Sequence, residues 1–207
     1  MTKFISNFKL LFLIKILIFS LFFGNNVYAE NINNNDKIIA LGKNDAPVII
    51  KVFSSHTCPH CASFHLNVLP EIEKKYIASG KAQVIFMDFP LDQAAFNASK
   101  LLHCTNKKNQ ITFLDKIYEK QNEWTQWSNI EKINDNLKKI VKNLGISEIQ
   151  FNKCLNNESI SDKILNDRIE GQKKYSIEST PTIIINEKKL EGAADFKNIS
   201  KRIEKII

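Results

Sequence analysis

Three apolar runs separated by helical patterns organise the chain. Residues 48–53, 83–89 and 182–185 are almost continuously apolar. Runs of this length predict strands, and their apolar character predicts a sheet that is covered on both faces. Residues 62–78 repeat apolar side chains at helical spacing, and Pro70 is expected to kink this helix. The order strand, helix, strand predicts a βαβ unit with a parallel pair of strands.

Shorter signals add an edge strand, a hairpin and a last helix. Residues 38–41 form a brief apolar run that ends at a glycine, which is typical of an edge strand. Asn186 and Glu187 make a predicted tight turn into a strand at residues 188–191. Asp195 precedes a segment with one apolar face, so we expect it to cap the C-terminal helix.

Between the second and third apolar runs the pattern is helical throughout. Residues 92–175 therefore predict an all-helical domain inserted into the α/β fold. Ser128 with Glu131, and Ser147 with Gln150, have the spacing of capping boxes that open two of its helices.

Four side chains of the helical block are candidates for its core. Trp124 and Trp127 lie between two predicted helices and are expected to pack in the core rather than to bind a ligand. Cys104 and Cys154 fall on two different helices, where they are either lone buried thiols or the halves of a structural disulfide. In an oxidising compartment we favour the disulfide, worth about 4 kcal/mol from loop entropy.

The N-terminal part has the pattern of a targeting segment. Residues 1–29 combine a basic start, an apolar centre and a small-residue cleavage site after Ala29, which is typical of a secretory signal peptide. An uncleaved membrane anchor is the alternative, and contact with a membrane is expected only in that case. The asparagine-rich residues 30–36 would form a loose tail. The expected location is the periplasm, where disulfides persist.

Charge and composition favour a solvated globular domain. The chain has 207 residues, of which 43% are hydrophobic, and its net charge is +7. Three of these charges belong to lysines of the leader, and the other basic residues are spread without forming a block. A dispersed lysine surface is expected to be solvated, so no nucleic-acid partner is predicted.

The main chemical candidate is the segment Cys58-Pro59-His60-Cys61, which follows the first strand and opens a helix. At this edge, free backbone N–H groups and the helix dipole would stabilise a Cys58 thiolate, the form that attacks disulfides. Pro59 suits a first helical turn because it has no N–H to satisfy. Cys61, one turn further, is expected to be shielded and to act as the resolving thiol.

Three other interpretations of the motif compete with redox chemistry. A c-type haem site requires a histidine directly after the second cysteine, where this chain has Ala62. A zinc site, with His56, His60 and His65 nearby, would normally need a second pair of ligands, so no metal is predicted although the alternative stays open. A purely structural disulfide would close almost no loop and would add little stability. Redox chemistry therefore accounts best for the motif.

The strand, the Cys-Pro-His-Cys helix start and the later Ser179-Thr180-Pro181-Thr182 segment together resemble the thioredoxin superfamily. The Pro-His pair between the cysteines is similar to the DsbA branch, the periplasmic thiol oxidases. The resemblance implies a thioredoxin-like α/β fold, a central mixed sheet flanked by helices, formed by residues 37–91 and 176–207 around the helical domain at 92–175. It also implies that no cofactor is needed.

The resemblance assigns further roles within the site. Pro181 matches the cis proline that faces the two cysteines and helps an extended substrate to pair with the backbone. Thr180 is expected to offer its hydroxyl to a cysteine sulfur. His60 is expected to favour the Cys58 thiolate, which makes the disulfide a stronger oxidant. A second bridge in the helical domain, found in some members, supports the pairing of Cys104 with Cys154.

One position departs from the family pattern. Many relatives have a buried acid six positions before the first cysteine, as a proton relay, whereas this chain has Val52 there. Proton handling at Cys61 is then expected to fall to water. His56 and His65 are expected to be surface or packing residues.

These observations predict an exported DsbA-like oxidase that transfers its Cys58–Cys61 disulfide to folding exported proteins with free cysteines. Reoxidation would come from a quinone-linked membrane partner such as DsbB. A disulfide isomerase or reductase is the alternative within enzymes. Outside enzymes, the alternatives are a surface-exposed binding protein on a thioredoxin-like scaffold and a zinc-binding module.

Overall fold

The structure, a computed structural model, describes residues 38–126 and 128–207 of the chain. The leader expected at 1–29, with its cleavage site, and the tail expected at 30–36 lie outside the described residues, as does Trp127. Across the part that is described, no helix combines the length and the apolar character needed to cross a membrane.

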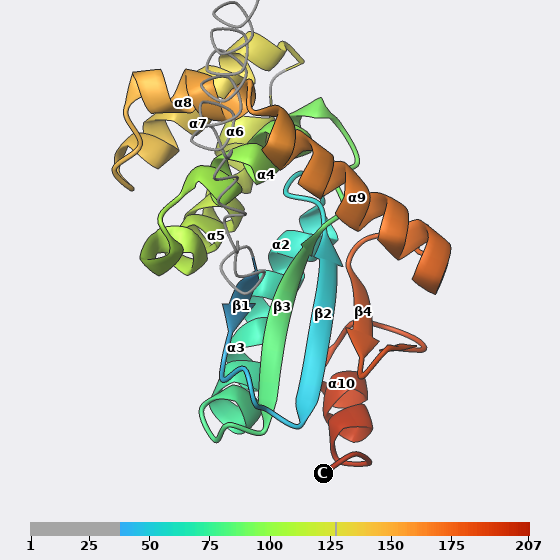
Figure 1. Cartoon of the computed structure of the whole chain (residues 1–207). Helices are drawn as coiled ribbons and strands as arrows, with labels where there is room; N and C mark the ends of the chain where they lie inside the picture. The colour runs from blue at the N-terminus through green and yellow to red at the C-terminus, as the bar shows by residue number, and fades with distance from the viewer. Residues whose placement is uncertain (1–37, 127) are drawn as a thin grey trace, which may run out of the picture. The chain divides into compact units, whose positions relative to one another are not determined.

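A five-stranded mixed sheet forms the centre of the described chain (Figure 1). Its strands are β1 (Ile39–Leu41), β2 (Val48–Ser54), β3 (Ala82–Asp88), β4 (Thr182–Ile185) and β5 (Lys188–Lys189). Their order across the sheet is β1-β3-β2-β4-β5; β2 and β3 run parallel, and the other neighbouring pairs are antiparallel. The predicted edge strand, parallel pair and C-terminal hairpin are thus confirmed.

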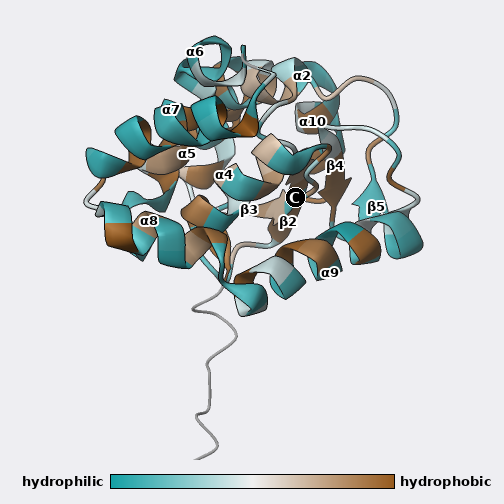
Figure 2. Cartoon of the chain, turned by 90° about the horizontal axis from the view of Figure 1, so that it is seen from above, coloured by the Kyte–Doolittle hydropathy of each residue, from teal (hydrophilic) through white to brown (hydrophobic). Residues whose placement is uncertain are grey.

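Alternation along the strands gives the sheet two apolar faces. On one face, Ile50 and Ile183 pack with the helix that follows β2 and with α10 (Phe196–Ile203). On the other face, Phe53 and Ile184 form a second cluster with residues from the end of α9. Figure 2 shows these strands in brown inside a ring of helices whose outer positions are mostly teal. The sheet is therefore covered on both sides, as its apolar strands predict.

One continuous helical stretch, from residue 59 to residue 77, joins β2 to β3. Its segments are α2 (Pro59–Ser63), η2 (Phe64–Val68), α3 (Leu69–Ile72) and η3 (Glu73–Ile77), and both η segments are π-helical turns. Pro70 lies in the first turn of α3, directly after the wider turn of η2. A proline gives no N–H to the preceding turn, and the altered hydrogen bonding of a π turn accommodates this gap without ending the helix.

The helical insertion lies between β3 and β4. It consists of α4 (Gln93–Cys104), the 3-10 turn η4 (Lys107–Asn109), α5 (Gln110–Glu119), α6 (Gln121–Thr125), α7 (Ile130–Lys142), α8 (Glu148–Leu155) and α9 (Glu158–Tyr175). These helices share an apolar core in which Trp124 is fully buried, as predicted, and its Nε1 donates to the Ile117 carbonyl at 2.8 Å.

The long helix α9 runs back from the insertion to the sheet, where it lies beside the strands (Figure 1). Gly171 allows its close approach, because a Cβ atom at this position would lie 2.8 Å from Cε1 of Phe53. A larger residue would push α9 away from the sheet.

Helix caps in the insertion agree with the sequence at one site and differ at another. The capping box of Ser147 and Gln150 forms at the start of α8. The box predicted from Ser128 is wrong, since the N-cap of α7 is Asn129, whose Oδ1 accepts from the N–H groups of Glu131 and Lys132. Asparagine caps a helix as well as serine does, so α7 begins one residue later.

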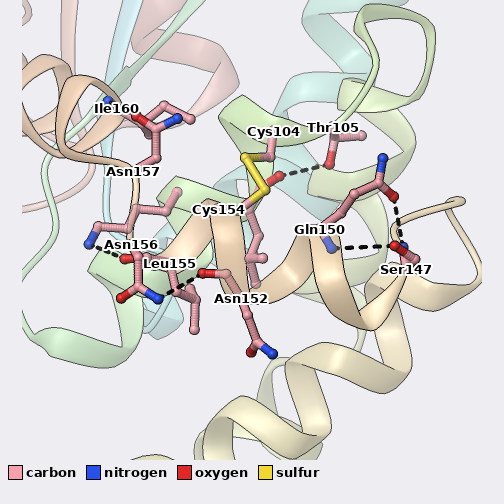
Figure 3. The surroundings of a disulfide bond; sticks show 12 residues. Cys104, Thr105, Ser147, Gln150, Asn152, Cys154, Leu155, Asn156, Asn157 and Ile160 are labelled. Carbon is pink, nitrogen blue, oxygen red and sulfur yellow. Dashed lines mark hydrogen bonds between the residues drawn. A yellow bond between two sulfur atoms is a disulfide. The ribbon is translucent and has the colours of Figure 1, made fainter.

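Cys104 and Cys154 are joined by a disulfide that links the end of α4 to α8 (Figure 3). Their Cα atoms are 6.0 Å apart, within the usual range for such a bond. The bridge fixes two helices that are 50 residues apart in the sequence.

Candidate active site

The Cys58–Cys61 motif lies where β2 ends and the helical stretch begins. Cys58 is the N-cap of α2, and its carbonyl accepts hydrogen bonds from the N–H groups of Cys61 at 3.0 Å and Ala62 at 3.2 Å. Both cysteines are free thiols, so this is the reduced form of the site. The exposed fraction is 8% for Cys58 and 1% for Cys61. The leading cysteine is thus the one that solvent reaches.

The segment before β4 faces Cys58 across the site. The Thr180–Pro181 peptide bond is cis. The Cys58 thiol donates a hydrogen bond to the Thr180 carbonyl oxygen at 3.3 Å. Thr180 Oγ1 is buried and has no hydrogen-bond partner among the described residues while Cys58 is a thiol, but its hydroxyl lowers the pKa of Cys58, so the expected contact with the sulfur stays a prediction. The hydroxyl is therefore free to donate to the sulfur once Cys58 is ionised.

The pKa of the Cys58 thiol is lowered from 9.0 to about 5. The largest cause is the hydrogen bond from the Cys61 thiol, which stabilises the neighbouring thiolate. Burial opposes ionisation, while the Thr180 hydroxyl and the backbone N–H groups of Cys61 and His60 favour it. Cys58 is therefore ionised at neutral pH, the state in which a cysteine attacks disulfides.

The pKa of the Cys61 thiol moves in the opposite direction and lies well above its ordinary value. The first cause is its hydrogen bond to Cys58, because loss of the Cys61 proton would break that bond. The second cause is burial, which disfavours a charged Cys61 thiolate. The site therefore holds one thiolate and one thiol at neutral pH.

Pro59 and His60, the two residues between the cysteines, are exposed. The contribution of His60 to the lowered pKa of Cys58 comes from its backbone N–H rather than from its imidazole. The predicted influence of the His60 ring stays a prediction.

A side chain of the helical insertion supports the motif from the other side. Gln121, at the start of α6, donates from Nε2 to the carbonyls of His56 at 2.8 Å and of Cys58 at 3.1 Å. No sequence pattern marks this residue, because Gln121 lies in a polar stretch 63 residues after Cys58.

His56 and His65, the histidines on either side of the motif, are packing residues. His56 is buried against the rings of Phe113 and Tyr118, and burial lowers its pKa to about 4. His65 is buried as well, and its Nε2 lies 2.8 Å from Asp115 Oδ1. Among the described residues, no three or more His, Cys, Asp or Glu side chains are grouped so as to hold a metal ion.

Sequence reasoning also missed a buried acid. Val52 lies in the apolar layer of the sheet, as its sequence position indicates. Asp88, at the end of β3, is buried and hydrogen-bonded to His103 of α4. The only available signal was a charged residue at the end of an otherwise apolar strand.

Comparisons with known proteins identify the family of the chain. A profile of the thioredoxin family matches residues 34–205. The crystal structure of alpha-DsbA1 from Wolbachia pipientis aligns with 82% of this chain and 90% of its own, with 31% identity and a TM-score of 0.74. The chain is a DsbA-like member of the thioredoxin superfamily.

Two further relatives of this DsbA-like chain are proteins of Bacillus subtilis and Rickettsia bellii. It is 29% identical over 170 residues to disulfide bond formation protein D of Bacillus subtilis, which covers 80% of this chain and 75% of that protein. It is 28% identical over 176 residues to a Rickettsia bellii protein named as a candidate protein-disulfide oxidoreductase. The match covers 85% of this chain but 66% of the Rickettsia protein, so the DsbA-like chain spans slightly under two thirds of that relative.

Proposed function

We propose that this chain is an exported thiol–disulfide oxidase that introduces disulfide bonds into folding proteins with free cysteines. The observation that carries the proposal is the position of Cys58 at the N-terminus of α2, opposite the cis Thr180–Pro181 bond, where its pKa is lowered to about 5 beside a thiol whose pKa is raised. A stabilised thiolate favours the reduced form of the pair, and a pair that favours its reduced form oxidises other thiols.

The reaction consists of two exchanges that conserve electrons and protons. A substrate thiolate attacks Cys58 Sγ of the oxidised protein; a mixed disulfide forms, the Cys58–Cys61 bond breaks, and Cys61 takes up a proton. A second substrate thiolate then attacks the substrate sulfur, which releases Cys58 as a thiolate. The substrate loses two electrons and the cysteine pair gains them. A quinone-linked membrane protein such as DsbB would accept these electrons in turn.

Two features support the proposed location in the periplasm. The leader pattern at residues 1–29 is typical of export. The disulfide between Cys104 and Cys154 lies outside the motif, and bridges of this kind persist in oxidising compartments.

The test uses two cysteine variants and a reduced peptide with two thiols. Cys58→Ser should abolish peptide oxidation, because no nucleophilic sulfur remains at the helix edge. Cys61→Ser should not oxidise the peptide either, because it has no Cys58–Cys61 disulfide to transfer. When the variant is mixed with the oxidised peptide, its Cys58 thiolate should attack the peptide disulfide and accumulate as a mixed disulfide, visible by mass spectrometry, because no Cys61 thiol is present to release it. Full oxidase activity in either variant would contradict these roles.

A redox titration against glutathione separates the oxidase from its alternatives. An oxidase should have a potential well above that of reducing thioredoxins, near −270 mV. A value close to theirs would favour an isomerase or reductase. A disulfide that exchanges with no thiol would favour a binding protein on the same scaffold.

A further inference from the structure

The start of α2 has no side-chain cap. Cys58 occupies the N-cap position with an extended backbone, φ −79° and ψ 119°, and its side chain makes no capping hydrogen bond. Serine, threonine, aspartate or asparagine would normally fix such a helix start through a side-chain oxygen. Here the side chain is the nucleophile and must stay available for exchange. The geometry of this helix start therefore depends on other groups.

Gln121 holds the backbone at this point from a distant part of the chain. Its Nε2 donates to the carbonyl of His56 at 2.8 Å and to the carbonyl of Cys58 at 3.1 Å. An amide nitrogen carries two hydrogens, so one glutamine can bind both carbonyls at once. These two bonds fix the direction of the peptide group that follows His56 and of the one that follows Cys58.

Other hydrogen bonds in the loop before α2 hold different groups. The Cys58 N–H donates to the Ser55 carbonyl at 3.1 Å, and the Thr57 hydroxyl donates to Asp92 Oδ2 at 2.7 Å. These bonds fix one N–H group and one side chain, and neither involves the two carbonyls that Gln121 binds. Loss of the Gln121 amide would therefore release both carbonyls while these contacts remain.

The Cys58 carbonyl has two further donors, which belong to α2 itself. They are the N–H groups of Cys61 at 3.0 Å and of Ala62 at 3.2 Å. Both would keep their bonds if the whole first turn shifted, because they would move with it. The bond from Gln121 comes from α6, so it fixes the position of this turn relative to the helical insertion.

The helix that carries Gln121 is itself anchored. Gln121 is 5% exposed and opens α6, three residues before the fully buried Trp124. Trp124 Nε1 donates to the Ile117 carbonyl of α5 at 2.8 Å, and the Thr125 hydroxyl donates to the Gln121 carbonyl at 2.7 Å. A buried side chain on a fixed element can hold its acceptors in one geometry, as a residue that supports an active site must.

The backbone that Gln121 binds determines where the Cys58 sulfur lies. The Cys58 thiol reaches the Thr180 carbonyl at 3.3 Å, and the backbone N–H groups of His60 and Cys61 favour the Cys58 thiolate. Each of these interactions requires a short distance and good alignment. A shift of the Cys58 backbone would therefore weaken all of them together.

We propose that Gln121 is a positioning residue for thiol–disulfide exchange: its amide holds the carbonyls of His56 and Cys58 so that Cys58 Sγ stays in one place opposite the Thr180 segment. Gln121 touches no reacting atom and acts through the backbone. The inference rests on the proposed exchange function. It gives the helical insertion a part in the chemistry, because the two cysteines lie in the thioredoxin-like part and Gln121 does not.

The test removes the amide and keeps the length of the side chain. In Gln121→Met the pH midpoint of Cys58 alkylation by iodoacetamide should rise by about one unit, which is a tenfold loss of thiolate stabilisation. The equilibrium with glutathione should shift about tenfold toward the oxidised protein, a potential about 30 mV more negative. Attack of glutathione on Cys58 of the oxidised variant should slow roughly tenfold, because the sulfur is no longer held in one position.

Gln126, at the other end of α6, offers a matched control. It is exposed, and its Nε2 donates to the Glu123 carbonyl of α6 itself at 3.1 Å. Gln126→Met removes an amide-to-carbonyl hydrogen bond of the same kind and should keep the wild-type midpoint, potential and rate. An equal loss in this variant would overturn the inference, since the effect would then not depend on the active-site carbonyls.

A second variant at the same position separates reach from polarity. Gln121→Asn keeps an amide but is one methylene shorter, so its nitrogen falls short of the two carbonyls. It should show the same three changes as Gln121→Met. It also decides the question if Gln121→Met does not fold, as judged by circular dichroism.

Two further results are distinguishable from each other. Folded Gln121→Met and Gln121→Asn proteins with the wild-type midpoint, potential and rate would refute the positioning role alone. A wild-type protein that exchanges with no thiol would refute the proposed function and the inference together.

Discussion

Cys58 and Cys61 are the same amino acid three residues apart, yet the fold gives them opposite acidity. Cys58 lies at the helix edge opposite the Thr180 carbonyl, where several donors point at one sulfur. Cys61 lies one turn further in, is almost fully buried, and supplies the strongest of those donors. The same hydrogen bond therefore lowers the pKa of Cys58 and raises the pKa of Cys61.

A titration of the reduced protein tests this asymmetry. Alkylation of Cys58 by iodoacetamide should follow its thiolate fraction, with a midpoint near pH 5 and a rate that falls as the pH drops below it. In Cys61→Ala the midpoint should rise, because the main hydrogen-bond donor is gone. A wild-type midpoint near 9, the usual value, would contradict the assignment.

Among individual residues, the sequence identified the reactive cysteine pair but not the side chains that hold its backbone in place. The CxxC spacing before a helix was enough to place Cys58 and Cys61. Gln121 and Asp88 make their hydrogen bonds with other segments of the chain, and periodicity carries no information about such contacts. The contact between Cys58 and the Thr180 carbonyl was not predicted, because the spacing does not show how the backbone turns.

Element boundaries were predictable wherever a local interaction sets them. Ser147 and Gln150 cap α8 through contacts within four residues, so their spacing was sufficient. At α7 two neighbouring residues, Ser128 and Asn129, were both suitable caps, and local chemistry alone did not choose between them.

The disulfide between α4 and α8 should contribute strongly to stability. Replacing both Cys104 and Cys154 by serine releases the loop of 50 residues in the unfolded state, which should lower the free energy of unfolding by about 4 kcal/mol. Urea unfolding of the variant and of the wild type gives this difference. The fully reduced wild type should unfold like the variant, and an unchanged urea midpoint in the variant would contradict the expectation.

For the whole molecule, the spacing of apolar residues along the sequence was sufficient to predict two halves of a sheet with a helical insertion between them. The strands are buried on both faces, so their patterns are continuous and easy to detect. The close approach of α9 to the sheet at Gly171 was not predictable, because it depends on Phe53, more than a hundred residues earlier.

The ionisation of one sulfur should change the stability of the entire fold. In the reduced protein the pKa of Cys58 falls from 9.0 to about 5, so its contribution is fully present above pH 9 and is lost as the pH falls through 5. In the oxidised protein neither cysteine titrates. The reduced form should therefore gain stability relative to the oxidised form between pH 5 and pH 9.

Denaturant unfolding of both forms across this pH range measures the effect. Carboxylates titrate alike in the two forms and cancel in the difference. A difference between the forms that does not vary with pH would show that the Cys58 thiolate is not stabilised by folding.

The amide of Gln121 has a mechanical consequence. It holds the carbonyls of His56 and Cys58 from α6, so the reactive loop is fastened to the helical insertion as well as to the sheet. Hydrogen bonds weaken steeply with displacement and misalignment. A polypeptide that binds to the helices and tilts α6 therefore also displaces the backbone that carries Cys58.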